Sequence, residues 1–124
     1  MYLVYIIVSD NLSYIGMTND FFKRWKQHNS YLKGGARYTS KKTNWTPICI
    51  IDGFKTKSEA MQCEWRLKRV RGQKNRIEYL SHLLKNEKKW TSKSPLIKNQ
   101  SLVIYTIEKY NDLFNDYKEL VWFN

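Results

Sequence analysis

A run of apolar and aromatic residues opens the chain, and turn-forming residues at 9–11 separate it from a second short run at 12–16. With the two-residue period of a strand, Tyr5 shares one face with the apolar residues two positions away on either side. The pattern predicts a β-hairpin with Tyr5 on its first strand. Tyr14 lies on the second strand, on the same face as Gly16. Tyrosine is common in strands, so either tyrosine taken alone is an ordinary strand residue.

Helical spacing follows the hairpin. Residues 21–28 place two aromatic side chains on one side and place Arg24 and His28, four residues apart, on another. Polar residues at 18–20 supply N-cap candidates for this helix. Residues 45–54 then predict a third strand.

Two further helices are expected after that strand. Thr56 and Glu59 form a capping box, and the helix that they open runs to about Val70, with Gly72 as its stop. A later helix, at about 75–85, carries apolar residues at helical spacing. The predicted fold class is therefore α/β, with a small mixed sheet of about three strands flanked by helices.

A loop at 33–43 joins the first helix to the third strand and contains two adjacent glycines and several cations. A solvated surface loop accounts for this composition. Alternatively, the loop follows a phosphate backbone, which the glycines allow to approach closely. The candidate DNA-binding residues in this loop and at the end of the following helix are Arg37, Lys41, Lys42, Arg66 and Arg69.

The pattern weakens after residue 86. The expected elements are a loop at 88–95, a strand at 102–107, a short helix at 110–117 and a closing strand at 120–123. This tail holds more apolar side chains than a solvated segment does. We therefore expect a domain at 1–86 and a C-terminal extension at 87–124 that packs on the same domain.

The net charge of +11, from 22 Lys and Arg against 11 Asp and Glu, favours a polyanionic partner: nucleic acid first, an anionic membrane surface second. No apolar run is long enough to span a bilayer. The only two cysteines, Cys49 and Cys63, are far apart and form no CxxC pair, which argues against a zinc module and fits a reducing compartment. With no signal-peptide pattern at the N-terminus, we expect an intracellular protein, cytoplasmic or nuclear.

Glu64 is a lone carboxylate in a basic and apolar helix. Taken alone, it is readily explained as an ion-pair partner for Lys68, four residues on. Alternatively, Glu64 binds Mg²⁺, which commonly takes one or two carboxylates and completes its shell with water and substrate phosphate.

Taken together, these residues resemble the GIY-YIG endonuclease superfamily over about residues 1–84. The family's first glycine and its isoleucine are replaced by Leu3 and Val4, whereas the tyrosine that carries chemistry is kept as Tyr5. Asn75 corresponds loosely to the family's late asparagine. The residues that carry the resemblance are Tyr5, Tyr14-Ile15-Gly16, Arg24, His28 and Glu64.

The similarity extends to the catalytic subunit of eukaryotic structure-selective endonucleases, which cut branched DNA. That subfamily adds a zinc-binding module that docks a scaffold protein, and this sequence has no such cysteines. The need for a scaffold protein or a homodimer therefore stays open. The segments that resemble the subfamily are 27–29, 34–37, 39–41, 53–54, 64–65 and 79–97.

The resemblance implies a role for each site residue. Tyr5 is the general base or holds the attacking water, and Tyr14 supports Tyr5 or a phosphate oxygen. Arg24 stabilises the charge of the pentacovalent phosphate, and His28 accepts or relays a proton from the tyrosine. Glu64 binds the divalent ion, Mg²⁺ or Mn²⁺.

The function expected from this resemblance is divalent-metal-dependent hydrolysis of DNA at junctions, flaps or forks, in repair or recombination. A catalytically silent nucleic-acid-binding module is one alternative, although binding alone would not need Glu64 in a basic helix. A GIY-YIG nuclease with a restriction or homing role is another, and a structural protein with a basic surface is the remaining one.

Overall fold

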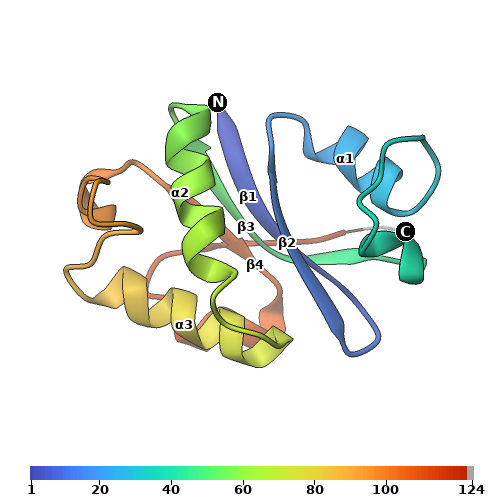
Figure 1. Cartoon of the computed structure of the whole chain (residues 1–124). Helices are drawn as coiled ribbons and strands as arrows, with labels where there is room; N and C mark the ends of the chain where they lie inside the picture. Colours follow the sequence, from blue (N-terminus) through green and yellow to red (C-terminus); the bar gives the residue numbers. More distant parts are fainter. Residues whose placement is uncertain (123–124) are drawn as a thin grey trace.

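Five strands form one mixed sheet in the computed structural model, which describes residues 1–122 (Figure 1). The order across the sheet is β2–β1–β3–β4–β5, and every neighbouring pair is antiparallel except β4 and β5, which are parallel. The predicted α/β class is confirmed, with two more strands than the three expected. The strands are β1 (Tyr2–Ser9), β2 (Leu12–Thr18), β3 (Thr46–Phe54), β4 (Val103–Thr106) and β5 (Lys118–Glu119).

The predicted hairpin is confirmed as β1 and β2. Tyr5 lies directly opposite Gly16, and Ile7 lies opposite Tyr14, so both tyrosines are on one face of the sheet. The connecting turn places Asp10 at a φ of 52°, a left-handed conformation that aspartate tolerates better than most residues. The pattern of the sequence therefore fixes which face of the hairpin carries the tyrosines.

Helices α2 (Lys57–Leu67) and α3 (Gln73–Lys85) lie on the opposite face of the sheet from the tyrosines (Figure 1). The predicted cap of α2 is present, since the Thr56 hydroxyl accepts a hydrogen bond from the Glu59 amide at 3.1 Å. The predicted helix end was wrong. After Leu67 the backbone tightens into bonds between residues three apart, and Gly72, with a φ of 90°, precedes α3 instead of ending α2.

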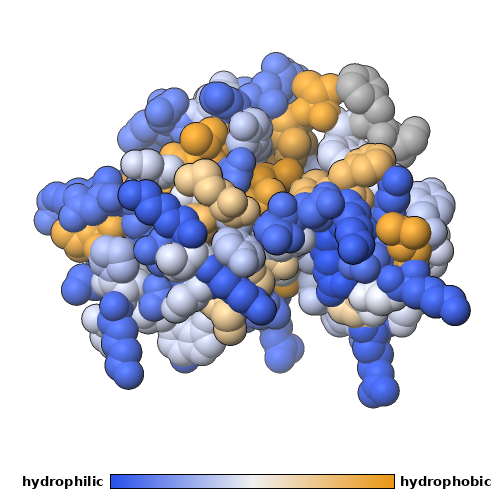
Figure 2. Space-filling view, turned by 90° about the horizontal axis from the view of Figure 1, so that it is seen from above, coloured by the Kyte–Doolittle hydropathy of each residue, from blue (hydrophilic) through white to orange (hydrophobic). Residues whose placement is uncertain are grey.

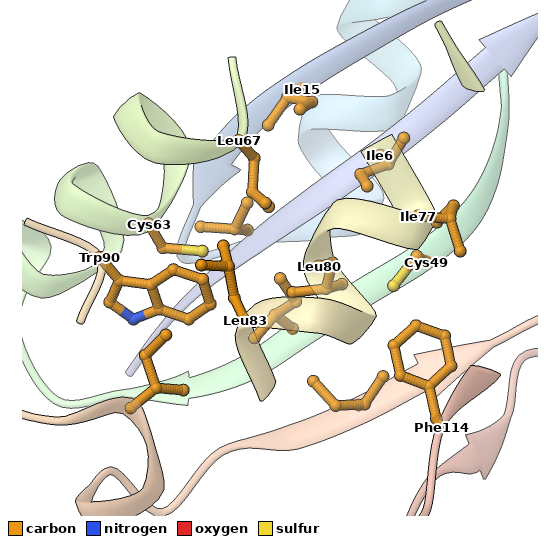
Figure 3. Close-up of a cluster of buried hydrophobic side chains, with 14 of the residues drawn as sticks. Ile6, Ile15, Cys49, Cys63, Leu67, Ile77, Leu80, Leu83, Trp90 and Phe114 are labelled. Carbon is orange, nitrogen blue, oxygen red and sulfur yellow. The ribbon is translucent and has the colours of Figure 1, made fainter. Parts of the chain in front are cut away.

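The larger core fills the space between this face, the two helices and the tail (Figure 3). Both cysteines lie in it as buried free thiols. Side chains from beyond residue 86 join the same cluster as those of α2 and α3. The division into a domain at 1–86 and an extension at 87–124 stays a prediction. The tail's fully or nearly fully buried members are Trp90, Ile97, Ile104, Tyr110 and Phe114.

Helix α1 (Phe21–His28) packs on the tyrosine face, and the Asp20 carboxylate caps it by accepting from the Lys23 amide at 3.2 Å. Buried Asn29 then ties the end of the helix to the start of β3. Its side-chain oxygen accepts from the Trp45 amide at 2.6 Å, and its amide nitrogen donates to the Trp45 carbonyl at 3.1 Å. This polar link holds the last turn of α1 at a fixed place above the hairpin.

Two predictions for the tail were wrong in detail. A 3₁₀ helix at Glu108–Leu113 replaces the short helix expected at 110–117, because its backbone bonds join residues three apart. The closing strand is β5, not 120–123, and Phe123 lies outside the described residues. The strand expected at 102–107 is confirmed as β4.

Hydrophilic side chains cover most of the face seen in Figure 2, and hydrophobic atoms show in smaller areas between them. This distribution fits the large positive net charge of the chain. Over residues 1–122, none of the helices combines the length and the apolar character that crossing a membrane requires.

Candidate active site

Tyr5 and His28 form the buried centre of the candidate site. The Tyr5 hydroxyl lies 2.6 Å from Nε2 of His28, and each residue is about 1% exposed. Tyr5 comes from the middle of β1, and His28 is the last residue of α1, which Phe21 and Trp25 anchor on the same sheet face. The two side chains, which the family resemblance implies act together, are thus in direct contact.

Gly16 gives the Tyr5 hydroxyl its space. A Cβ atom on Gly16 would lie 2.3 Å from the Tyr5 hydroxyl oxygen, closer than any non-bonded contact allows. The group that approaches this glycine closely is the side chain of Tyr5, its partner across the hairpin.

We expect Gly16→Ala to displace the Tyr5 ring. Because Tyr5 is buried and cannot swing away freely, the change should cost about 1–3 kcal/mol of the free energy of unfolding. Misplacing the hydroxyl should also lower any rate that depends on it by about 10²-fold at temperatures where the protein stays folded. Thermal unfolding measures the change in stability, and single-turnover cleavage measures the change in rate. An unchanged rate would contradict the role of Gly16 in leaving space for the Tyr5 hydroxyl.

Tyr14 brings the site to the surface. Its ring centroid lies 5.0 Å from that of His28 and 6.5 Å from that of Tyr5. On another side it stacks on Tyr38, with centroids 5.9 Å apart and an angle of 24° between the rings. Tyr14 is only partly buried, so it connects the enclosed Tyr5–His28 pair with solvent.

Arg24 places a positive charge beside this pair. Its Nη1 atom donates to the Gly34 carbonyl at 2.7 Å and to the Gln27 side chain at 2.9 Å. Burial raises the pKa of Tyr5 well above its ordinary value, and the nearby guanidinium of Arg24 opposes that rise. Burial first, and the Arg24 charge second, lower the pKa of His28 to about 4. At neutral pH the imidazole is therefore uncharged and able to accept a proton.

An NMR titration of His28 tests this electrostatic picture. We expect its imidazole to titrate near pH 4, because the buried, charged form is disfavoured beside Arg24. Unfolding returns the pKa to about 6.5, so the unfolded state binds more protons between these values. His28 should therefore make stability rise with pH from about 4 to 6.5. A midpoint at or above 6.5 in the folded protein would contradict the assigned environment.

Glu64 approaches from α2, on the other face of the sheet. Its Oε1 atom pairs with Nζ of Lys68 at 2.6 Å, and that Nζ lies 5.7 Å from the centre of the Tyr14 ring. The charge of Glu64 contributes to the raised pKa of Tyr5. Because β2 is an edge strand, side chains from both faces can meet at that edge. The ion pair that Glu64 was expected to form with Lys68 is thus present in the structure, and Lys68 links the carboxylate to the Tyr14 ring.

Glu64 fits a metal that needs few protein ligands. Within the part of the chain that the structure describes, no group of three or more His, Cys, Asp or Glu side chains could enclose an ion. That excludes a zinc cage there but suits Mg²⁺ or Mn²⁺, whose remaining positions water and a substrate phosphate fill.

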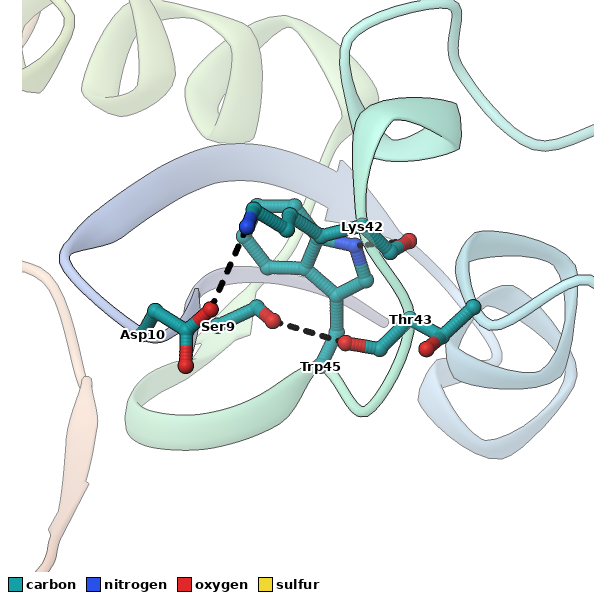
Figure 4. Close-up of polar contacts among 5 residues, drawn as sticks. All are labelled: Ser9, Asp10, Lys42, Thr43 and Trp45. Carbon is teal, nitrogen blue, oxygen red and sulfur yellow. Dashed lines mark hydrogen bonds and ion pairs between the residues drawn. The ribbon is translucent and has the colours of Figure 1, made fainter.

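The basic loop at 33–43 is fastened over the hairpin turn (Figure 4). The Ser9 hydroxyl donates to the Thr43 carbonyl at 2.7 Å, and Lys42 pairs with Asp10 at 3.3 Å. Nε1 of buried Trp45 donates to the Lys42 carbonyl at 3.1 Å and to the Thr39 carbonyl at 2.9 Å. The loop is therefore held in place by the hairpin turn on one side and by Trp45 on the other, although its cations are exposed.

A groove beside Tyr14 holds cations that the sequence analysis did not assign to the site. It has a volume of about 550 Å³, and its walls include Tyr38, Lys68 and Arg71. Arg76 forms a fixed part of the wall, since its guanidinium donates to the Val70 carbonyl and to the Ser13 carbonyl and hydroxyl. The basic run at 66–71 in the sequence signalled Lys68 and Arg71 in advance, whereas nothing signalled Arg76, which meets Ser13 across 63 positions.

The residues expected to bind DNA are spread over two regions. Arg37 is exposed in the loop, and Lys41 lies over the Tyr38 ring at 4.8 Å, beside the groove. Arg66 instead lies over Tyr79 of α3, and Arg69 lies over Trp65 at 3.8 Å. Neither contacts the Tyr5–His28 pair. Asn75 donates to the Arg71 carbonyl at the start of α3.

The similarity to known proteins covers the part of the chain that contains the candidate site. The sequence profile of the GIY-YIG catalytic domain matches residues 1–78. A structure-specific endonuclease subunit slx1 of Schizosaccharomyces japonicus is 41% identical over 68 residues, which are 52% of this chain and 25% of that protein. A structure-specific endonuclease subunit SLX1 homolog of Giardia intestinalis is 42% identical over 52 residues, which are 42% of this chain and 14% of that protein.

A UPF0213 protein of Bacillus velezensis is 34% identical over 90 residues, which are 73% of this chain and 87% of that protein. The chain thus spans a quarter or less of the two structure-specific endonuclease subunits, and most of the bacterial relative. The matched profile covers more than half of the chain and includes every residue of the candidate site, so the chain belongs to the GIY-YIG family.

Proposed function

We propose that this protein is a divalent-metal-dependent DNA endonuclease that cuts branched DNA at junctions, flaps or forks. One observation carries the proposal: Tyr5, Tyr14, His28, Arg24 and Glu64 gather at the β2 edge, beside a basic groove. Relatives named structure-specific endonuclease subunits support the choice of branched DNA and of a further protein subunit as partner. A role in repair or recombination belongs to the same proposal.

The proposed chemistry divides among these side chains. Tyr5, hydrogen-bonded to His28, takes a proton from the attacking water as its own hydroxyl proton passes to Nε2. Arg24 stabilises the negative charge that builds on the phosphate. Glu64 would hold Mg²⁺ or Mn²⁺, after Lys68 moves off the carboxylate. A bound divalent ion would withdraw electron density from a phosphate oxygen and neutralise developing charge.

The groove provides a path for the DNA strand that leads to this phosphate. Lys68 and Arg71 are exposed along it, and Tyr14 lies both in the groove and against His28. Its volume is that of a small-molecule site, so a strand enters it but a duplex does not. An unpaired strand next to the cut is what flaps and forks offer and plain duplex lacks.

A cleavage assay tests the proposed function. The full chain is incubated with forked, flapped and fully paired DNA of the same sequence, in Mg²⁺ or Mn²⁺ and in excess chelator. The proposal predicts cutting of the branched substrates only, and none with chelator. Tight binding without any cutting would favour a catalytically silent module, and equal cutting of plain duplex would favour a restriction or homing role.

DNA binding should weaken steeply with salt. If Lys68 and Arg71 each neutralise one phosphate of the single strand in the groove, and Arg37 and Lys41 each neutralise one phosphate of duplex, log K should fall against log salt with a slope of about −3.2. Arg71→Gln should make the slope shallower by about 0.7, whereas Lys98→Gln, which removes a cation paired with Glu87 in the tail, should leave it unchanged. A flat salt profile of the unmodified protein would mean that the positive charge serves another purpose.

A further inference from the structure

The side of His28 that faces away from Tyr5 is also engaged. Nδ1 of His28 lies 2.8 Å from the hydroxyl oxygen of Thr39, which is fully buried. That hydroxyl in turn donates its proton to the Ala36 carbonyl at 2.9 Å. A continuous chain of hydrogen bonds therefore runs from Tyr5 through His28 and Thr39 to the backbone of the basic loop.

The direction of this chain follows from counting protons. A threonine hydroxyl has one proton, and Thr39 gives it to Ala36, so toward His28 its oxygen can only accept. Nδ1 of His28 must then carry the imidazole proton. In a neutral imidazole this leaves Nε2 bare, facing the Tyr5 hydroxyl.

We propose that Thr39 is a positioning residue that holds His28 in the Nδ1–H tautomer, so that Nε2 can accept the Tyr5 proton during DNA cleavage. The inference rests on the proposed function for its catalytic consequence, but the tautomer itself can be measured without DNA. When Nε2 receives the Tyr5 proton, both ring nitrogens carry one, and the Nδ1 proton keeps its acceptor on Thr39.

The loop is built so that Thr39 is held independently of its hydroxyl. The Thr39 carbonyl accepts from Nε1 of Trp45 at 2.9 Å, and Trp45 is fully buried. Gly35, just before Ala36, packs so closely on α1 that a Cβ there would lie 2.4 Å from the Gln27 carbonyl oxygen. Replacing only the hydroxyl should therefore leave the backbone in place.

The test compares three variants of the full chain. Thr39→Val keeps the shape of the side chain and removes the hydroxyl, and Thr39→Ser restores the hydroxyl. Ser40→Ala is the matched control, because the Ser40 hydroxyl makes the same kind of bond to a carbonyl three residues earlier, that of Arg37. The tautomer is read from ¹⁵N chemical shifts of labelled His28, and cleavage is read as a single-turnover rate on forked DNA with Mg²⁺.

We expect the Nδ1–H tautomer in the unmodified protein, in Thr39→Ser and in Ser40→Ala. In Thr39→Val the Nε2–H tautomer should appear, and the rate should fall about tenfold while DNA affinity is unchanged. An Nε2–H tautomer in the unmodified protein would overturn the proposal even if Thr39→Val failed to fold. So would a Thr39→Val protein with unchanged tautomer and rate. If the unmodified protein cuts no DNA, the proposed function fails, while the tautomer measurement still decides the role of Thr39.

Discussion

Glu64→Gln should abolish DNA cutting while leaving DNA affinity equal or higher. The amide keeps the size of the side chain but loses the charge that would hold a divalent ion, and the loss of that ion's electrostatic stabilisation should cost about 10³-fold or more in rate. Affinity should not fall, because removing a negative charge frees Lys68, 2.6 Å away, to face phosphate. Single-turnover rates and equilibrium binding on the same forked DNA measure both quantities.

The chain offers a matched control for this change. Lys74 and Glu78 on α3 form an ion pair with the same four-residue spacing, at 3.7 Å and in solvent. Glu78→Gln removes the same charge from the protein without touching the site, so its rate should equal that of the unmodified protein. If Glu64→Gln cuts as fast as Glu78→Gln, Glu64 has only the ion-pair role.

Tyr5→Phe should lower the cleavage rate by about 10²–10⁴-fold, the effect of losing a general acid–base group. The ring remains in its buried position, so thermal stability should change little, apart from the loss of the hydrogen bond to His28. The loss of rate should persist at saturating Mg²⁺, because the substitution leaves the metal site intact and does not act by weakening metal binding.

Tyr105→Phe controls for the removal of a phenol from the same face of the sheet. Tyr105 lies on β4, packed against the same aromatic cluster as Tyr5 but away from His28. Its variant should cut normally. If the Tyr5→Phe protein also cuts normally, Tyr5 is an ordinary strand residue with no part in catalysis.

Local patterns made the first two thirds of the fold predictable. The alternation in β1 set the face on which Tyr5 lies, and the caps at Asp20 and Thr56 set where α1 and α2 begin. These signals depend on neighbours a few residues apart, which a sequence displays directly. The tail was harder, because the segment around Tyr110 is too short to hold an α-helix by itself and takes its form from packing.

The site was predictable only as far as a family resemblance reached. That resemblance gave roles to Tyr5, His28 and Glu64. It covered Thr39 only within the segment 39–41 and gave it no role, because the contact of Thr39 with His28 depends on a loop that folds back on α1. It also could not place Arg76, which joins the groove through a contact with distant Ser13. Contacts between segments far apart leave no periodic pattern, so they become visible only in the folded chain.

One measurement tests most directly whether these parts act on a single phosphate. Crystals of the Tyr5→Phe protein with forked DNA and Mn²⁺ would keep the strand uncut, and the anomalous scattering of manganese would locate the ion. The account predicts a manganese peak bound to the Glu64 carboxylate, with Lys68 displaced and a phosphate of the DNA facing residue 5 and His28. Manganese bound elsewhere while Glu64 stays paired with Lys68, or DNA bound away from β2, would contradict it.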